Sequence, residues 1–221
     1  MVNAAGLTLA LDASTYVGTV AVLRDGAVVA ARDAQMRGEH EERLMPAVLA
    51  ALADVRAVPR DVARVVCGEG PGSFTSLRIA GAIAKGIAHG AGRPLYAVSS
   101  LALVVAGAEP PLPQGAYVAT LDAMRGERYA QRVSVHRDGR IAVEGPSTLA
   151  SAAELAAAGL HVVGPLEPAP RWPHARGVAR LLDSVLAAPV SLDAWEPSYG
   201  RLAEAQVRWE AAHGRPLGGA S

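Results

Sequence analysis

Short apolar runs separated by polar turns divide the first hundred positions into strands and two helices. The runs predict strands over 7–11, 19–23, 27–31, 62–67 and 95–98. Asp25-Gly26 is typical of a hairpin turn between the second and third strands. Helical spacing predicts helices over 43–55 and 73–90, the first with an apolar face of Leu44, Val48, Leu49, Leu52 and Val55. This order of elements predicts an α/β fold in which helices cover a mixed sheet.

The second half of the chain begins with a similar pattern. Strands are predicted over 117–121, 129–136, 141–143 and 160–163, and helices over 151–158 and 174–186. In both halves a strand leads to a polar turn with an aspartate, Asp12 or Asp122, and then to an Asp-Gly hairpin, which suggests a duplication. The proline-rich segment 108–115 separates the halves and predicts two lobes, 1–107 and 116–221. Residues 196–201 are predicted to be extended and to lead into an amphipathic tail.

A glycine-rich turn between strand 62–67 and the following helix is the strongest candidate for a binding loop. Gly68, Gly70 and Gly72 permit positive φ and a close approach by a ligand or another backbone. Ser73 or Thr75 is predicted to cap the helix, whose free N–H groups would favour an anion. A ligand-binding turn and a purely structural turn both remain open.

Known nucleotide motifs do not fit this turn. A Walker-type phosphate loop needs Lys-Ser or Lys-Thr after its last glycine, and the only lysine of the chain, Lys85, lies well inside the helix. The glycine spacing also departs from the dinucleotide fingerprint. The remaining candidates for weak nucleotide binding are Asp12, Gly70, Gly72 and Ser73. Asp12 could orient a nucleotide-bound magnesium ion, but a structural hydrogen-bonding role is favoured.

Two different stripes of side chains, one aliphatic and one of small residues, run along helix 73–90. Ile79, Ile83 and Ile87 form an aliphatic ridge, while small residues recur four apart at 82, 86 and 90. Small residues let another helix approach closely. Packing within the chain, against the sheet or helix 43–55, is favoured on spacing alone, and packing against a partner helix is the alternative.

Composition narrows the classes of function. The chain has 221 residues, 51% of them hydrophobic, enough for one large or two small domains. Its 21 basic and 21 acidic residues cancel, so no overall field attracts nucleic acid or an anionic membrane. A single cysteine, Cys67, excludes an intramolecular disulfide and is predicted to be buried in a strand. The first residues resemble neither a signal peptide nor an anchor, which predicts a cytoplasmic location.

Candidate catalytic groups are few, and we predict no catalytic residue. Asp122, Arg125 and Glu127 form a charged loop without a nucleophile, interpreted as a turn connecting the lobes. Ser73 lies in Gly-Ser-Phe and not in the Gly-x-Ser-x-Gly elbow of hydrolases. No two of the six histidines lie four apart, so a local His-x-x-x-His metal site is not expected.

Five ordered segments carry a family resemblance that spans residues 7–135. They are LDAST (11–15), EHEERLMP (39–46), GPGSFTSLRI (70–79), VSSL (98–101) and DAMRGERY (122–129), with a weaker match at 197–201. The chain resembles the TsaB (YeaZ) family, which takes part in forming N6-threonylcarbamoyladenosine at position 37 of bacterial tRNAs. It departs from the family at Ala13, where Thr is frequent, and at Ser76 and Ala80, where Gly is frequent, which adds bulk near the turn.

The resemblance implies an ASKHA fold, the two-lobed architecture of actin and sugar kinases. It also implies a non-catalytic subunit that binds the catalytic relative TsaD, with TsaE and TsaC in the same pathway and tRNA, of the kind reading ANN codons, held only through the complex. Helices 43–55 and 73–90 would pair with TsaD, or with a second copy when the chain is alone. The interface candidates on and beside these helices are His40, Arg43, Met45, Leu49, Leu52, Arg78, Ala82, Lys85 and Gly86.

No metal and no cofactor are expected, apart from weak binding of ATP and magnesium. Two other functions remain as alternatives. The first is an independent ATP-binding or ATP-hydrolysing enzyme of the same fold. The second is the glycoprotease activity once attached to the superfamily, which requires the missing histidine pair and ranks last.

Overall fold

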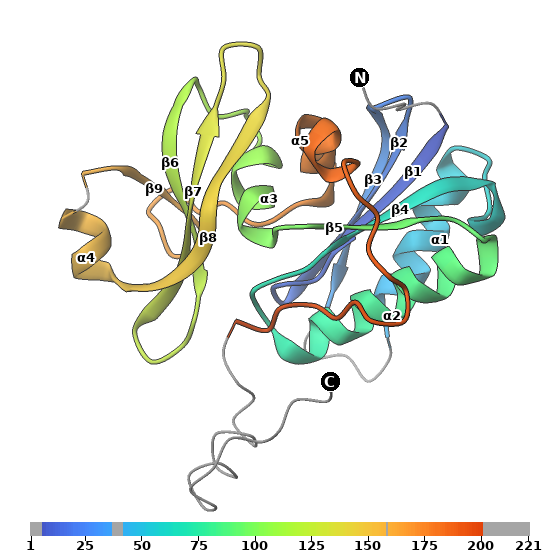
Figure 1. Ribbon diagram of the computed structural model, residues 1–221, viewed down its shortest axis with the longest axis horizontal. Helices are drawn as coiled ribbons and strands as arrows, with labels where there is room; N and C mark the ends of the chain where they lie inside the picture. The colour runs from blue at the N-terminus through green and yellow to red at the C-terminus, as the bar shows by residue number, and fades with distance from the viewer. Residues whose placement is uncertain (1–5, 37–41, 158, 201–221) are drawn as a thin grey trace, which may run out of the picture.

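The protein is described here from a computed structural model covering residues 6–36, 42–157 and 159–200, and its first lobe is built on a five-stranded mixed sheet (Figure 1). The strand order is β3-β2-β1-β4-β5. Strands β1, β2 and β3 form an antiparallel meander, and β1, β4 and β5 are parallel neighbours. Their bounds are β1 Leu7–Asp12, β2 Val17–Arg24, β3 Ala27–Gln35, β4 Val62–Gly68 and β5 Leu95–Val98.

The second lobe repeats the first four strands. Its sheet has the order β8-β7-β6-β9, with β6, β7 and β8 antiparallel and β9 parallel to β6. The strands are β6 Gly115–Asp122, β7 Glu127–Val135, β8 Ile141–Ser151 and β9 His161–Val163. This topology matches β3-β2-β1-β4, so the predicted relation between the halves is confirmed at the level of strand order. Strand β8 is much longer than the three residues predicted.

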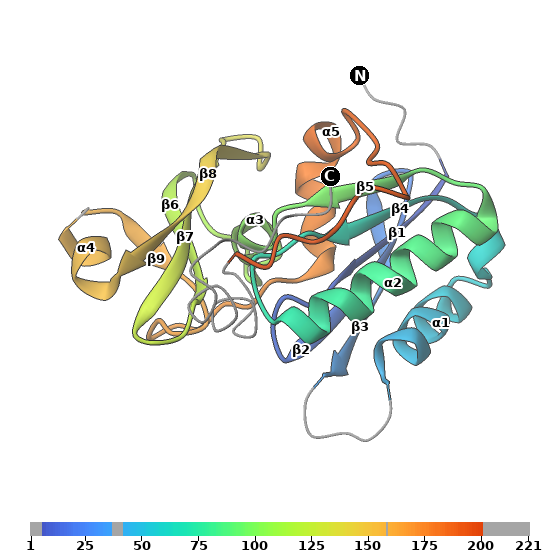
Figure 2. The same ribbon diagram turned by 60° about the horizontal axis from the view of Figure 1, so that its bottom comes forward.

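Helices cover the first sheet on both faces (Figures 1 and 2). The helices α1 (Leu44–Asp54) and α2 (Phe74–Ala91) lie on one face, and α3 (Ser100–Ala106) and α5 (Val178–Val185) lie between the two sheets. The helix α4 (Ala152–Ala157) packs on the second sheet, and short 3-10 turns occupy Pro59–Asp61 and Ala175–Gly177. The prediction missed α3, because every residue of this helix is buried and it has no polar face to reveal the helical period.

Two hydrophobic cores follow from these layers. One lies between the first sheet and α1 and α2, and includes Cys67 as predicted. The other lies between the two sheets and contains α3 and α5. Burial raises the pKa of the Cys67 thiol well above its ordinary value, so this cysteine stays protonated at neutral pH.

Near the end of the described chain, residues 190–199 form a strap that returns to the first lobe (Figure 1). The Val190 N–H donates to the Leu95 carbonyl at 2.8 Å, and the Ser198 N–H donates to the Glu69 carbonyl at 2.6 Å. Segments from the predicted second lobe therefore pack on the first sheet, while the lobe boundaries themselves stay a prediction. Within the described ranges, no helix is long and apolar enough to cross a membrane. The predicted amphipathic tail lies outside the described residues.

Candidate functional site

The glycine turn before α2 is packed against the chain's own backbone. A Cβ placed on Gly70, whose φ is +92°, would lie 2.2 Å from the carbonyl oxygen of Ser198. A Cβ on Gly72 would lie 2.1 Å from the carbonyl oxygen of Ser14, which also accepts a hydrogen bond from Ser73 N–H at 2.8 Å. Both glycines are needed because protein backbone occupies the space beside them. This packing favours the structural interpretation of the turn.

The buried Asp12 stabilises the glycine turn through hydrogen bonds. Its Oδ1 accepts hydrogen bonds from Ser14 N–H at 3.0 Å and Ser14 Oγ at 2.7 Å, and its Oδ2 accepts from Ser100 Oγ at 2.5 Å. Ser100 Oγ in turn accepts from Gly70 N–H at 3.0 Å. Burial raises the pKa of Asp12, although the bonds from Ser100 and Ser14 lower it. The predicted hydrogen-bonding role is confirmed. The part played by Ser100 was not predicted, although this residue lies in the VSSL segment (98–101) that contributes to the family resemblance.

The predicted side-chain cap of α2 is wrong. Ser73 occupies the N-cap position, but its side chain makes no capping hydrogen bond. The Ser73 hydroxyl lies instead 3.0 Å from the Ser76 hydroxyl. Ser76, one of the positions where the family often has glycine, supplies this alternative partner.

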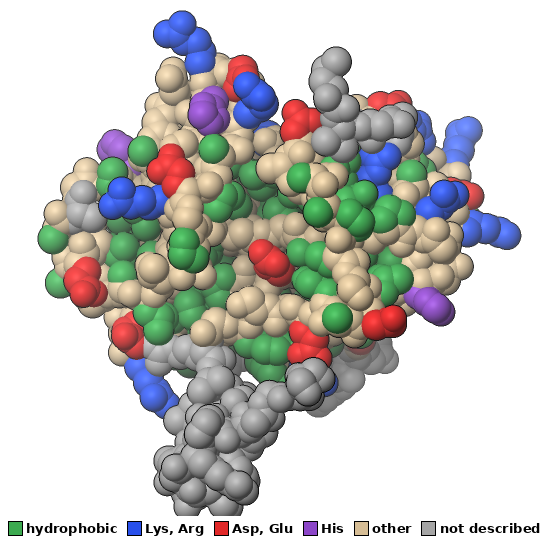
Figure 3. Space-filling view, viewed as in Figure 1, with side chains coloured by type: hydrophobic (Ala, Val, Ile, Leu, Met, Phe, Trp, Pro, Cys, Tyr) green, Lys and Arg blue, Asp and Glu red, His purple; other side chains and the backbone are tan. Residues whose placement is uncertain are grey.

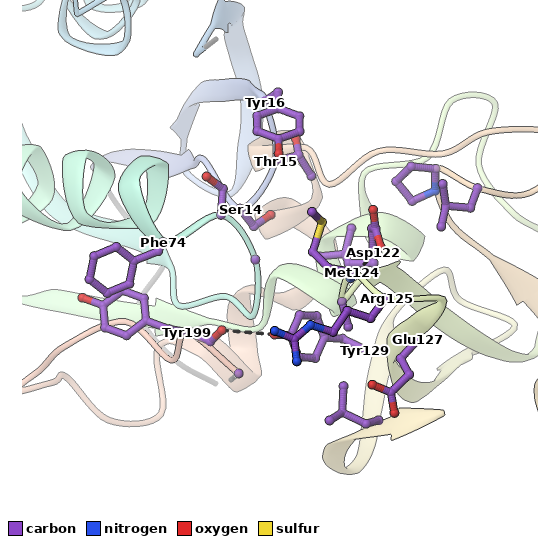
Figure 4. A pocket seen from close by; sticks show the side chains of 18 of the residues that line it. Ser14, Thr15, Tyr16, Phe74, Asp122, Met124, Arg125, Glu127, Tyr129 and Tyr199 are labelled. Atoms are coloured by element: carbon purple, nitrogen blue, oxygen red, sulfur yellow. Dashed lines mark hydrogen bonds between the residues drawn. The ribbon is translucent and has the colours of Figure 1, made fainter. Parts of the chain in front are cut away.

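A cleft of about 1030 Å³ separates the two lobes in front of the glycine turn (Figure 4). One wall comes from the β1–β2 turn and the start of α2, and the other from the β6–β7 turn, β8 and the loop after β9. The residues that line it are Ser14, Thr15, Tyr16, Gly72, Ser73, Phe74, Leu121, Asp122, Ala123, Met124, Arg125, Glu127, Tyr129, Leu149, Pro165, Leu166, Trp172, Tyr199 and Gly200. In Figure 3 hydrophobic side chains gather on both sides of the hollow between the lobes.

The charged loop 122–127 belongs to this cleft. It was interpreted as a turn between lobes, which is wrong, since it joins β6 to β7 inside one sheet. Met124 and Arg125 have positive φ, at 64° and 57°, and Asp122 Oδ1 accepts a hydrogen bond from Met124 N–H at 2.8 Å. The loop thus presents Met124 and Arg125 to the first lobe (Figure 4).

A second surface lies on α1 and α2, away from the cleft. Ala82, Gly86 and Gly90 are exposed, and a Cβ added at Gly86 or Gly90 would meet nothing within 4 Å. The favoured expectation that this stripe packs within the chain is therefore wrong. A shallow hollow of about 420 Å³ runs beside it, lined by Met45, Pro59, Arg60, Ile83, Gly86, Ile87, Gly90 and Ala91. We call the exposed part of α1 and α2 around this hollow the two-helix surface.

The other interface candidates divide by burial. Leu49 was predicted on the apolar core face of its helix but is 46% exposed, and so adds to the two-helix surface. Leu52 is fully buried in the core, which removes it from any surface that a partner could contact. Arg43 is exposed and Met45 is half-buried.

The two basic candidates on α2 contact aromatic rings. Arg78 lies with its guanidinium 5.3 Å from the ring centroid of Phe74, and the Lys85 ammonium lies 5.9 Å from that of Trp195. His40, the remaining candidate, lies outside the described residues. Among the residues that the structure describes, no group of three or more His, Cys, Asp and Glu side chains is arranged to hold a metal ion.

Comparisons with protein families and with curated proteins show which known proteins the sequence is similar to. Residues 34–160 match the family model of TsaD, tRNA N6-adenosine threonylcarbamoyltransferase. The chain is 36% identical to the tRNA threonylcarbamoyladenosine biosynthesis protein TsaB of Bacillus subtilis over 121 residues, which are 55% of this chain and 52% of the relative. It is 37% identical to the Escherichia coli protein of the same name, with the same coverage. The chain thus spans about half the length of the curated relatives it matches.

Solved structures agree with these relatives. A Pseudomonas aeruginosa protein described as similar to the peptidase YeaZ superposes with a TM-score of 0.76 at 26% identity, covering 89% of this chain and 100% of that one. A structure of YeaZ from the same organism superposes with a TM-score of 0.73 at 26% identity, covering 88% and 99%. The expected ASKHA-like, two-lobed α/β fold is confirmed by these matches.

Proposed function

Since the chain belongs to the TsaB (YeaZ) family, within the threonylcarbamoyltransferase group that the TsaD model describes, we propose that it is a non-catalytic subunit that binds TsaD. In this role it supports formation of threonylcarbamoyladenosine at position 37 of tRNAs that read ANN codons. The tRNA is held by the complex, since the chain's charges cancel. TsaC and TsaE act in the same pathway.

The observation that carries the proposal is the open two-helix surface. Gly86 and Gly90 leave the α2 backbone bare, and the exposed Leu49 and half-buried Met45 supply apolar side chains on α1. A helix carrying larger side chains could seat them in the hollow of about 420 Å³. An apolar, closely packed centre is characteristic of the core of a stable protein interface.

Two observations support the part of the proposal that gives this chain no catalytic role. The glycine turn is filled by the backbone of Ser14 and Ser198, and both oxygens of Asp12 accept hydrogen bonds from serines. Asp12 is therefore poorly placed to hold a metal-bound nucleotide, since its oxygens would first have to release Ser14 and Ser100.

Binding can be tested by light scattering with the cognate TsaD. The mixture should give a heterodimer mass at micromolar concentration, and two separate species would contradict the proposal. Ala82→Arg places a long charged side chain on the two-helix surface and should weaken the complex at least about tenfold, because the charge is desolvated without a partner. Ala153→Arg, on the exposed face of α4 in the other lobe, is the matched control and should bind TsaD normally.

The function itself requires reconstitution of tRNA modification with TsaC, TsaD and TsaE, with and without this chain. Modification should be lost without it, and should be reduced by Ala82→Arg but not by Ala153→Arg. Calorimetry with magnesium and ATP on the isolated chain addresses the main alternative. Tight binding accompanied by turnover would replace the proposed role with that of an ATP-using enzyme.

A further inference from the structure

Basic side chains line one side of the two-helix surface, where α2 meets the strap. Helix α2 carries Arg78, Lys85 and His89 and no acidic residue. Arg78 and His89 are exposed, and Lys85 is half-buried. Helical periodicity places the three within about 40° of one another around the helix axis, with Ala82 beside them. We call Arg78, Lys85 and His89 the cationic row.

The strap runs along α2 and holds two of these cations through aromatic rings (Figures 1 and 2). The ring of Tyr199 lies 4.5 Å from that of Phe74, and the Arg78 guanidinium lies 5.3 Å from the centroid of Phe74. The Lys85 ammonium lies 5.9 Å from the centroid of Trp195. A cation held over a ring has less side-chain freedom to lose when it pairs with a carboxylate. Both positions are therefore prepared for a partner that supplies negative charge.

The cationic row is not neutralised within the described chain. Neither Arg78 nor Lys85 forms an ion pair with a residue that the structure describes. Asp193 and Glu196 of the strap are exposed and form no described ion pair either. The acidic residues at the two ends of α1 are already engaged, one with Arg32 and the other with the first N–H groups of the helix. The face of α2 is thus positive, although the charges of the whole chain cancel.

A helix that carries carboxylates matches this row. Arg78 and Lys85 are seven residues apart, which corresponds to about 10.5 Å along α2. A helix packed at a shallow angle of about 20° stays beside α2 over this length, so that two carboxylates seven residues apart would face both cations. The apolar residues of the same helix would then lie over the hollow that Ile83 and Gly86 help to line.

Other occupants suit the surface less well. A second copy of this chain would bring the basic residues of its own α2 against the cationic row, and like charges at an interface disfavour association. Nucleic acid would match the charge of the row. It would not match the hollow beside the row, whose lining is mainly of apolar and small side chains.

We propose that the helix of TsaD that packs on the two-helix surface carries two acidic residues seven positions apart, which pair with Arg78 and Lys85. The proposal rests on the proposed binding of TsaD and specifies the chemistry that its helix presents. Ion pairs at the border of an apolar contact direct the encounter of two proteins and disfavour wrong partners. The strap serves this interface by holding both cations in place.

Zero-length cross-linking tests the pairing, because Lys85 is the only lysine of the chain. A carbodiimide activates a carboxyl group, and an amine in contact with that group displaces the reagent as a urea and forms an amide. In the complex, Lys85 should couple to an aspartate or glutamate of TsaD, and mass spectrometry should find a second acidic residue seven positions from it. Lys85→Arg keeps the charge but removes the amine, so this variant should keep the complex and lose the cross-link.

Charge reversal provides a second measurement, by surface plasmon resonance with TsaD. Arg78→Glu and Lys85→Glu should each weaken binding at least about tenfold at low salt, because each places like charges opposite one another. The affinity of the unaltered chain should fall as salt rises from about 0.05 to about 0.5 M, since salt screens exposed ion pairs. Arg137→Glu, at an exposed position of the second lobe, is the matched control and should bind TsaD normally. Circular dichroism checks that each variant is folded.

The outcomes distinguish this inference from the proposed function. If light scattering detects no complex with TsaD, both fail. If the complex forms but Lys85 gives no cross-link to TsaD, or charge reversal leaves the affinity unchanged, TsaD binding stands and the acidic helix is overturned. If charge reversal instead weakens binding of tRNA to the isolated chain and leaves the affinity for TsaD unchanged, the row serves RNA, and the inference is overturned as well.

Discussion

The two ends of α2 use glycine for opposite reasons. Before the helix, Gly70 and Gly72 lie against backbone carbonyls that a Cβ would contact at 2.2 and 2.1 Å. Toward the end of the helix, Gly86 and Gly90 face open space, where a Cβ would contact nothing within 4 Å. Glycine is required in the first region because the folded chain leaves no room, whereas in the second region the monomer does not need it.

The comparison indicates which region is available for binding. In the closed turn, the space that a ligand could use is taken by Ser14 and Ser198. On the two-helix surface the small residues expose the helix backbone. Glycine inside a helix is less stable than alanine, and no contact within the described part of the isolated chain offsets this loss of stability at Gly86 and Gly90. A partner that packs against Gly86 and Gly90 would account for that loss.

The largest expected effect is that of Gly72→Ala. The new methyl group would overlap the Ser14 carbonyl, so the turn or the β1–β2 connection must shift, and we expect the free energy of unfolding to fall by about 3 kcal/mol. Urea denaturation followed by circular dichroism measures this loss. An unchanged midpoint would mean that the turn is open enough to admit a ligand, which would remove the contrast between the two regions.

Ser100→Ala should have an intermediate effect. It removes a donor to Asp12 Oδ2 and the acceptor of Gly70 N–H, and we expect a loss of about 2 kcal/mol at neutral pH. Because the Ser100 bond lowers the pKa of Asp12, the variant should raise that pKa further. When the folded-state pKa of a carboxyl lies above its unfolded-state value, the free energy of unfolding of the protein falls as pH rises from the unfolded-state pKa through the folded-state pKa.

The loss caused by Ser100→Ala should therefore be larger at pH 7 than at pH 4. Urea denaturation at both values measures the difference. Ser184→Ala is the control, since the Ser184 hydroxyl donates only to the Leu181 carbonyl in α5 and should show the same small loss at both pH values. A loss from Ser100→Ala that does not depend on pH would indicate that the serine acts through packing alone.

The smallest expected effect is a gain in stability. Gly86→Ala places a methyl group in open space inside a helix and should raise the free energy of unfolding by about 0.5–1 kcal/mol. Gly92→Ala also meets no atoms but lies at the C-cap with φ of +62°, so it should instead lower stability by about 1 kcal/mol. Thermal or urea unfolding compares the two, and a loss of stability from Gly86→Ala would show that this glycine serves the monomer.

Most of the fold was predictable because its elements carry strong local signals. The Asp25-Gly26 turn and the helix α1, whose start is stabilised by hydrogen bonds from the N–H groups of Leu44 and Met45 to Glu42, follow from nearest neighbours in the chain. The prediction failed for α3, because burial on all sides removes the helical period of apolar and polar residues. It also failed where an apolar side chain lies on the surface of the monomer and not in its core. Leu49 fits the apolar spacing of α1 yet lies outside the core.

The site was less predictable, because its parts come together from distant segments. Ser100 reaches Asp12 across 88 positions, and the strap brings Ser198 to Gly70. The 122–127 loop appears in the sequence only as a charged turn, and the pairing of β6 with β7 decides that it faces the cleft. Nothing in the local sequence specifies these contacts.

The sequence by itself determined the positions of most strands along each half, the resemblance to the family, and the position of the glycine turn, since these depend on local spacing and on motifs. The order of the strands within each sheet came from the tertiary structure. The tertiary structure alone decided that the turn is closed and that the stripe at Ala82, Gly86 and Gly90 is open. The physical reason is that a glycine permits close approach without specifying what approaches it. Only the packing of remote backbone, present beside Gly72 and absent beside Gly86, distinguishes the two.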